Sequence, residues 1–184
     1  RFAGTLAYPN GFAVTLRPER LDQPLRWWRP RRIFVNSMSD LHQDGVPMGF
    51  VLQTYAVMQA CPRHIFMVLT KRADNMRAAI AKQQTGSGVV VNGKTLTQAY
   101  LNGVPLNVWL GVSVEDRKYG LPRIDILRET PAAVRFLSIE PLLEDLGAID
   151  LRGVGTLVVS WVATLPTAAA LSIFFFYFFK GLLS

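Results

Sequence analysis

The chain has 184 residues, a length that fits one domain with an appendage and allows a sizeable core. Its formal net charge is +7, and because Lys180 supplies one of these charges, residues 1–152 carry +6. A basic surplus favours nucleic acid, anionic lipid or phosphorylated small molecules as partners. The single cysteine excludes an intramolecular disulfide and, with only two histidines, a cysteine and histidine metal cluster.

The first residues lack the apolar core of a signal peptide, and the chain starts at arginine, which predicts a fragment or a processed product.

Residues 17–32 carry six arginines, three prolines and the pair Trp27 and Trp28. We expect an irregular surface segment that leads into the first strand. The alternative is a phosphate or nucleic-acid contact. Its arginines would be Arg26, Arg29, Arg31 and Arg32.

Four apolar runs rich in β-branched and aromatic residues each finish in polar residues, which is typical of strands buried on both faces. These predicted strands are residues 33–37, 65–70, 107–114 and 134–140. Helical patterns lie between them at 46–60, 72–84 and 121–130. The alternation predicts βα units with parallel pairing, either an incomplete barrel or an open sheet.

Residues 85–106 interrupt this rhythm, and the run "VVVNGKTL" within them has the Asn-Gly signal of a tight hairpin. We expect an excursion from the sheet rather than a separate domain.

Cys61 follows the first long helical pattern, where we expect a small hydrophobic side chain at a helix end and no nucleophile. His64 lies three residues later across a proline turn, which does not define a catalytic pair.

The carboxyl ends of parallel strands are where α/β folds gather their reactive groups. The predicted rim consists of Asn36, Ser37, Asp40, Thr70, Lys71, Arg72, Ser113, Glu115 and Glu140. Lys71 and Arg72 are suited to a phosphate or carboxylate, and Glu115 and Glu140 to an amine or a ribose hydroxyl. The alternative is that Asp40 caps the next helix and that the charges are solvated.

At these strand ends the sequence resembles a known family. The motifs "RRIFVNSMSDL", "HIFMVLTKR", "LNVWLGVSVED" and "TPAAVRFLSIEPLL" are similar to those of the phage gene product 37 / gene product 68 family, over about residues 1–152. That family looks like a divergent branch of the radical S-adenosylmethionine barrels. The resemblance therefore implies a partial (β/α) barrel, truncated at both ends, whose parent family uses a [4Fe–4S] cluster and S-adenosylmethionine.

Members of that family place a cysteine cluster just before the point where this chain begins. A cluster needs several thiolates, and Cys61 stands alone. The leading interpretation is a barrel fragment of unknown substrate that holds no cofactor and is inactive by itself. A basic, phage-associated protein that binds nucleic acid is an alternative.

The tail is different in character. Residues 153–179 carry no charged side chain, and about 20 apolar residues suffice to cross a bilayer as a helix. We expect residues 156–179 to form a membrane helix that tethers a cytoplasmic domain, so that the domains are 1–152 and 153–184. The tail resembles the last membrane helix of the inorganic phosphate transporter family. This similarity adds a membrane protein fragment as a further alternative, and it suggests a join of two coding sequences near residues 150–155.

Overall fold

Four parallel strands form the centre of the chain in a computed structural model that describes residues 13–83, 88–96 and 104–147. They are β1 (Arg32–Val35), β2 (Ile65–Thr70), β5 (Val108–Ser113) and β6 (Val134–Ser138). The order in the sheet is β1-β2-β5-β6, and every neighbouring pair is parallel. The prediction of a mixed α/β fold with these four parallel strands is confirmed.

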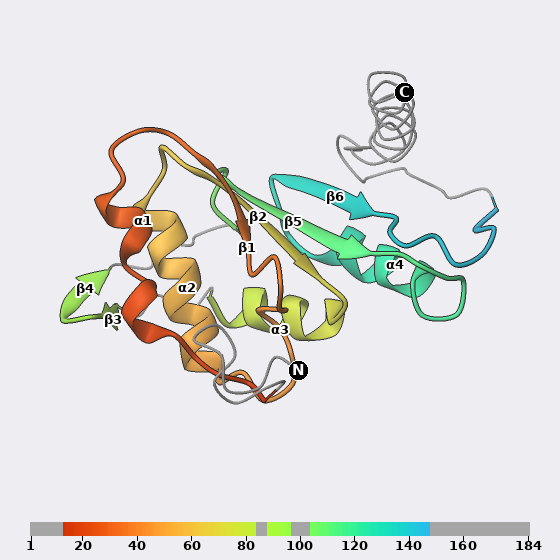
Figure 1. Ribbon diagram of the computed structural model, residues 1–184, viewed down its shortest axis with the longest axis horizontal. Coiled ribbons are helices and arrows are strands. Elements are labelled where there is room, and N and C mark those ends of the chain that lie inside the picture. Colours follow the sequence, from red (N-terminus) through yellow and green to blue (C-terminus); the bar gives the residue numbers. More distant parts are fainter. Residues whose placement is uncertain (1–12, 84–87, 97–103, 148–184) are drawn as a thin grey trace, which may run out of the picture.

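Each connection between neighbouring strands contains a helix. They are α2 (Met48–Ala60), α3 (Ala73–Gln83) and α4 (Leu121–Glu129), which follow β1, β2 and β5 respectively. All three lie along one side of the sheet (Figure 1). This placement is what right-handed crossovers produce when each strand pairs with the next one along the chain.

The helices give the two faces of the sheet different environments. Phe66, Val68 and Leu110 point toward the helices and are at most 2% exposed. The register places Phe34 beside Met67 on the opposite face, where Phe34 is 42% exposed and Met67 half-buried. The core of the described chain therefore lies between the sheet and its helices, and the other face is only partly covered.

The Asn-Gly hairpin is confirmed. Strands β3 (Val89–Val91) and β4 (Lys94–Leu96) pair antiparallel. The turn between them has positive φ angles of 46° at Asn92 and 78° at Gly93, the conformation that favours these two residue types. Gln53 Nε2 donates to the carbonyl of Val90 at 3.0 Å and so ties the hairpin to α2.

The segment before β1 is more regular than the sequence predicts. It contains a 3-10 turn, η1 (Pro18–Arg20), and one helical turn, α1 (Gln23–Arg26). Arg63 stabilises the end of α1, because its Nε donates to the carbonyl of Trp27 at 2.7 Å. This contact spans 36 residues, so the local pattern alone does not reveal it.

Within the described residues no helix is long and apolar enough to cross a membrane. The tail helix predicted at 156–179 and the domain boundary predicted at 152 lie outside the described part of the chain.

Cys61 is fully buried directly after α2, as expected for a small hydrophobic side chain at a helix end.

Candidate functional site

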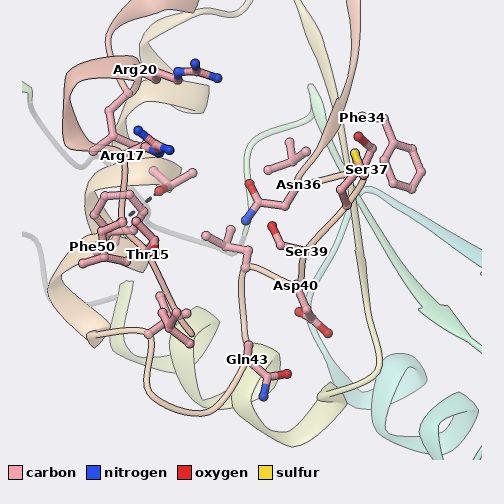
Figure 2. Close-up of a pocket in the computed structure, with 18 of the residues that line it drawn as sticks. Thr15, Arg17, Arg20, Phe34, Asn36, Ser37, Ser39, Asp40, Gln43 and Phe50 are labelled. Carbon is pink, nitrogen blue, oxygen red and sulfur yellow. Dashed lines mark hydrogen bonds between the residues drawn. The ribbon is translucent and has the colours of Figure 1, made fainter. Parts of the chain in front are cut away.

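Two adjoining cavities open beside β1. The larger, of about 970 Å³, lies between residues 13–17, β1 and α2. Figure 2 shows Arg17 and Arg20 at one end of this cavity and Asn36 and Asp40 across from them. The smaller, of about 370 Å³, lies at the carboxyl ends of β1, β2 and β5. It is lined by Phe34, Asn36, Ser37, Ser39, Asp40, Gln43, Leu69, Thr70, Lys71, Arg72 and Ser113.

Asp40 joins the ends of the first two strands. Its carboxylate accepts hydrogen bonds from the Thr70 hydroxyl at 2.8 Å and from the backbone amides of Lys71 and His42 at 2.9 Å. The hydroxyl of Thr70 in turn accepts from the amide of Arg72 at 2.8 Å. The predicted alternative, that Asp40 caps the next helix, is wrong: the residue that precedes α2 is Pro47, and no side chain caps that helix.

Glu115 is the most buried carboxylate of the rim, with 5% of the residue exposed. One of its oxygens forms an ion pair with Lys71 Nζ, and the other lies 2.7 Å from Arg123 Nη1. Burial raises the pKa of Glu115, but the hydrogen bonds and positive charges of Lys71 and Arg123 outweigh burial and hold this pKa below its ordinary value of 4.5. Glu115 is therefore an ionised anchor that fixes two cations.

A third ion pair of the rim joins Arg72, which lines the smaller cavity, to Asp44. Arg72 Nε is 3.4 Å from the carboxylate of Asp44, which also accepts from Asn75 Nδ2 at 2.9 Å. The charged groups of the rim are three cations and three anions. They are Lys71, Arg72, Arg123, Asp40, Asp44 and Glu115. Because these charges sum to zero, the rim matches a zwitterion better than a multiply charged anion.

The buried side chain of His42 packs behind the loop that holds Asp40. It is 2% exposed, and its Nε2 lies 3.2 Å from the hydroxyl of Tyr55. Burial lowers the pKa of His42 from 6.5 to about 4, although the nearby charge of Asp40 acts in the opposite direction. Among the described residues its Nδ1 has no hydrogen-bond partner. The neutral ring thus completes the packing under the loop that holds Asp40.

Most of the predicted rim is brought together by the structure. Eight of its nine residues line the smaller cavity or pair directly with a residue that does. Glu140 follows β6, but it lines neither cavity and has no hydrogen bond or ion pair with the others in the described part of the chain. The arginines 26, 29, 31 and 32 lie at the opposite, amino-terminal end of the strands.

The sequence patterns do not single out Arg123 or the pair of Arg17 and Arg20. Arg123 is the third residue of α4, and the sequence predicts it only as part of a helical pattern. Its Nη1 reaches both the carbonyl of Ser113 at 2.7 Å and Glu115, because the chain turns back sharply after β5. No local sequence pattern points to this role, because the contact depends on that turn.

The residues of this chain do not fit an iron–sulfur cluster. Cys61 is the only cysteine of the sequence, its side chain is buried, and burial raises the pKa of its thiol, which disfavours the thiolate. Across residues 13–83, 88–96 and 104–147, no group of three or more His, Cys, Asp or Glu side chains is placed to hold a metal ion.

Comparison with known proteins gives one match. A family model described as "Protein of unknown function (DUF5131)" matches residues 1–164, which extends twelve residues beyond the domain boundary predicted at 152. No curated protein matches the chain, and no solved structure does. Because the family model covers most of the sequence, the chain belongs to the DUF5131 family.

Proposed function

We propose that this chain is part of a radical-S-adenosylmethionine-like (β/α) barrel and that its rim binds a small zwitterionic ligand of the S-adenosylmethionine type. The observation that carries the proposal is the charge-balanced rim at the carboxyl ends of β1, β2 and β5. An amino acid needs cationic groups for its carboxylate and anionic groups for its ammonium, and the rim contains both. The rim also lies at the end of a parallel sheet where α/β folds bind their ligands.

The strand order supports a barrel rather than a doubly wound sheet. Each strand pairs with the next parallel strand along the chain, in the order β1-β2-β5-β6, with no point at which the order reverses. A doubly wound sheet has such a switch point and helices on both faces, whereas a barrel adds strands in one direction and keeps its helices outside. The three helices on one side of the sheet fit the second arrangement (Figure 1).

The face without helices supports the same proposal. The register places large apolar side chains on it, and Phe136 packs over Gly111 so closely that a Cβ at that position would lie 2.4 Å from the ring. Its apolar residues are Phe34, Met67, Leu69, Trp109 and Phe136. Layers of apolar side chains of this kind fill the interior of (β/α) barrels.

The side chains of the rim suggest how the ligand would be held. Lys71 is half exposed at the mouth of the smaller cavity and can pair with a carboxylate. The hydroxyls of Ser37 and Ser39 and the amide of Asn36 line the same cavity and can bind ribose or amino groups. Because one buried cysteine cannot ligate a cluster, we propose that this chain by itself binds such a ligand without radical chemistry.

A calorimetric titration of the full chain with S-adenosylhomocysteine, a stable analogue of the same class, tests the proposal. We expect saturable binding that the Ser39→Leu substitution weakens by about tenfold or more, because a leucine would occupy part of the smaller cavity without breaking any of the ion pairs. Lys118→Met is the matched surface control and should leave the dissociation constant unchanged. Absence of binding, or equal effects of the two substitutions, would contradict the proposal.

A further inference from the structure

We propose that a second site binds single-stranded nucleic acid at the amino-terminal end of the sheet, opposite the rim. The site is the Arg/Trp surface, which consists of Trp28, Arg29, Arg31, Arg32 and Arg63. All five residues are exposed. The charge, the aromatic side chain and the rigidity of this surface carry the inference, and none of them depends on the ligand proposed for the rim.

The Arg/Trp surface is assembled from two parts of the chain. Arg32 is the first residue of β1 and pairs in register with Ile65, the first residue of β2, and Arg63 precedes that residue by two positions. Parallel neighbours begin at the same edge of a sheet, so the segment from α1 to β1 and the turn before β2 meet there (Figure 1).

The positive charge of the surface is not neutralised. Arg29, Arg31 and Arg32 form no ion pair with any acidic side chain of the described residues, and Arg63 donates only to the carbonyls of Pro24, Leu25 and Trp27. Hydrogen bonds to neutral carbonyls leave a guanidinium charge in place. Nearby, only Arg26 is paired, with Asp22 at 2.8 Å. Four positive charges thus face solvent, in contrast to the balanced rim.

Buried contacts hold the surface rigid. The backbone amide of Arg31 donates to His64 Nδ1 at 3.2 Å, and Nε2 of the same buried ring donates to the carbonyl of Pro24 at 3.1 Å. The rings of Trp27 and His64 pack edge to face, with centroids 6.0 Å apart. A surface that is ordered before its partner arrives loses less entropy on binding.

The aromatic side chains suit stacking with bases. Trp28 is 77% exposed, and the guanidinium of Arg29 lies 4.9 Å from its ring centroid. Arg31 lies 4.5 Å from the ring centroid of Trp27. An exposed ring beside arginines that can bind phosphates is the combination that single-stranded nucleic acids use, since each unpaired base can stack on the ring. A duplex hides the faces of its bases and would use only the charges.

The composition of the surface favours nucleic acid over a membrane. A surface that inserts into lipid needs several exposed apolar side chains, and within residues 17–32 Trp28 is the only exposed large one. The cations are all arginines, whose planar groups bind a phosphate with two parallel hydrogen bonds. We therefore commit to a single-stranded polynucleotide as the partner.

Fluorescence anisotropy of the full chain with a labelled 20-nucleotide oligothymidylate tests the inference, together with a duplex of equal length and vesicles of phosphatidylserine. We expect the oligothymidylate to bind more tightly than the duplex. The logarithm of its association constant should fall with the logarithm of salt concentration with a slope of about −3, because four arginines would each release counterions from one phosphate.

Single substitutions sharpen the test. Trp28→Ala should weaken oligothymidylate binding by about 5- to 150-fold through the loss of one stacked base. Arg29→Gln and Arg32→Gln should each reduce the magnitude of the salt slope by about 0.7. Tyr119→Ala is the matched control: Tyr119 is 58% exposed and Lys118 Nζ lies 4.8 Å from its ring centroid, so it is also an aromatic residue with a cation, and its removal should change nothing.

Three results would overturn the inference. They are no binding of oligothymidylate, a salt slope near zero, and equal losses from Trp28→Ala and Tyr119→Ala. Vesicle binding that Arg29→Gln and Arg32→Gln weaken, without binding to oligonucleotide, would assign the surface to a membrane instead. Ser39→Leu should leave oligonucleotide binding intact, so that failure of this inference and failure of the rim proposal are separate outcomes.

Discussion

Arg123 Nη1 lies 2.7 Å from Oε2 of Glu115, and this contact joins the first turn of α4 to the carboxyl end of β5. The other carboxylate oxygen of Glu115 holds Lys71 at the mouth of the smaller cavity. The position of the Lys71 ammonium therefore depends on a residue 52 positions further along the chain, and Arg123 is a positioning residue of the proposed rim.

Arg123→Gln should lower the free energy of unfolding by at least about 2 kcal/mol, because it leaves the buried Glu115 with only one of its two cations. Urea denaturation at neutral pH measures this change. The exposed pair of Arg77 and Glu129 provides the control, and Arg77→Gln should cost at most about 1 kcal/mol. Equal costs for the two substitutions would contradict the anchoring role of Glu115.

The same substitution should raise the pKa of Glu115, since one of the two groups that lower it is removed. A carboxyl group with a lowered pKa in the folded state stabilises the protein above its ordinary pKa of 4.5, and this stability is lost as the pH falls below that value. In Arg123→Gln, protonation of Glu115 should therefore account for a smaller part of the stability lost as the pH falls. An identical pH profile for Glu115→Gln and the unsubstituted chain below pH 4.5 would be inconsistent with this.

His42 should make stability depend on pH in a different range. Its pKa is about 4 when folded and 6.5 when exposed, so between these values the unfolded chain binds more protons than the folded one. Stability should fall by up to about 3 kcal/mol as the pH is lowered from 6.5 to 4. Urea denaturation across this range should show the loss, and His42→Asn should remove most of the pH dependence while keeping a polar side chain near Tyr55.

Gly111→Ala should destabilise the chain by about 1 to 3 kcal/mol, because the new Cβ would lie 2.4 to 2.6 Å from three carbons of the Phe136 ring. Thermal or urea unfolding measures the loss, and a second substitution, Phe136→Leu, should restore part of it. Gly49→Ala is the control: apart from its chain neighbours and the backbone of its own helix, no atom lies within 4 Å of the added Cβ, and in a helix the change should be neutral or mildly stabilising. Tolerance of both alanines would show that Phe136 does not pack over Gly111.

The membrane helix proposed for residues 156–179 has its own test. With no charged side chain between residues 153 and 179, the full chain should fractionate with membranes and require detergent for extraction. A chain ending at residue 152 should remain in the supernatant. Recovery of the full chain in the supernatant without detergent would contradict the membrane helix.

The strands were predictable because their apolar runs are continuous, which reflects burial against helices on one face and apolar contacts on the other. Most residues of the rim were predictable, because the carboxyl ends of parallel strands meet at one edge of the sheet. Asp40, Lys71 and Glu115 therefore lie together there. Arg123 was not predictable, since its contact with Glu115 requires the turn in which the amide of Gly120 bonds to the carbonyl of Asp116. A turn of this kind produces no periodic pattern in the sequence from which it could be predicted.

The short helices before β1 were also not predictable, for a related reason. α1 has only four residues and includes Pro24, so its own propensity is weak. Its carbonyls instead bind Arg63 and His64, which lie about 40 positions later. Structure that depends on such distant partners cannot be inferred from a local window of sequence.

A crystal structure of the full chain with S-adenosylhomocysteine tests the central proposal most directly. The account predicts density for the ligand in the smaller cavity, with its carboxylate near Lys71 and its other polar groups near Asn36 and Ser39. Density bound elsewhere, or a rim occupied only by solvent at saturating ligand in a chain that retains its fold, would contradict it.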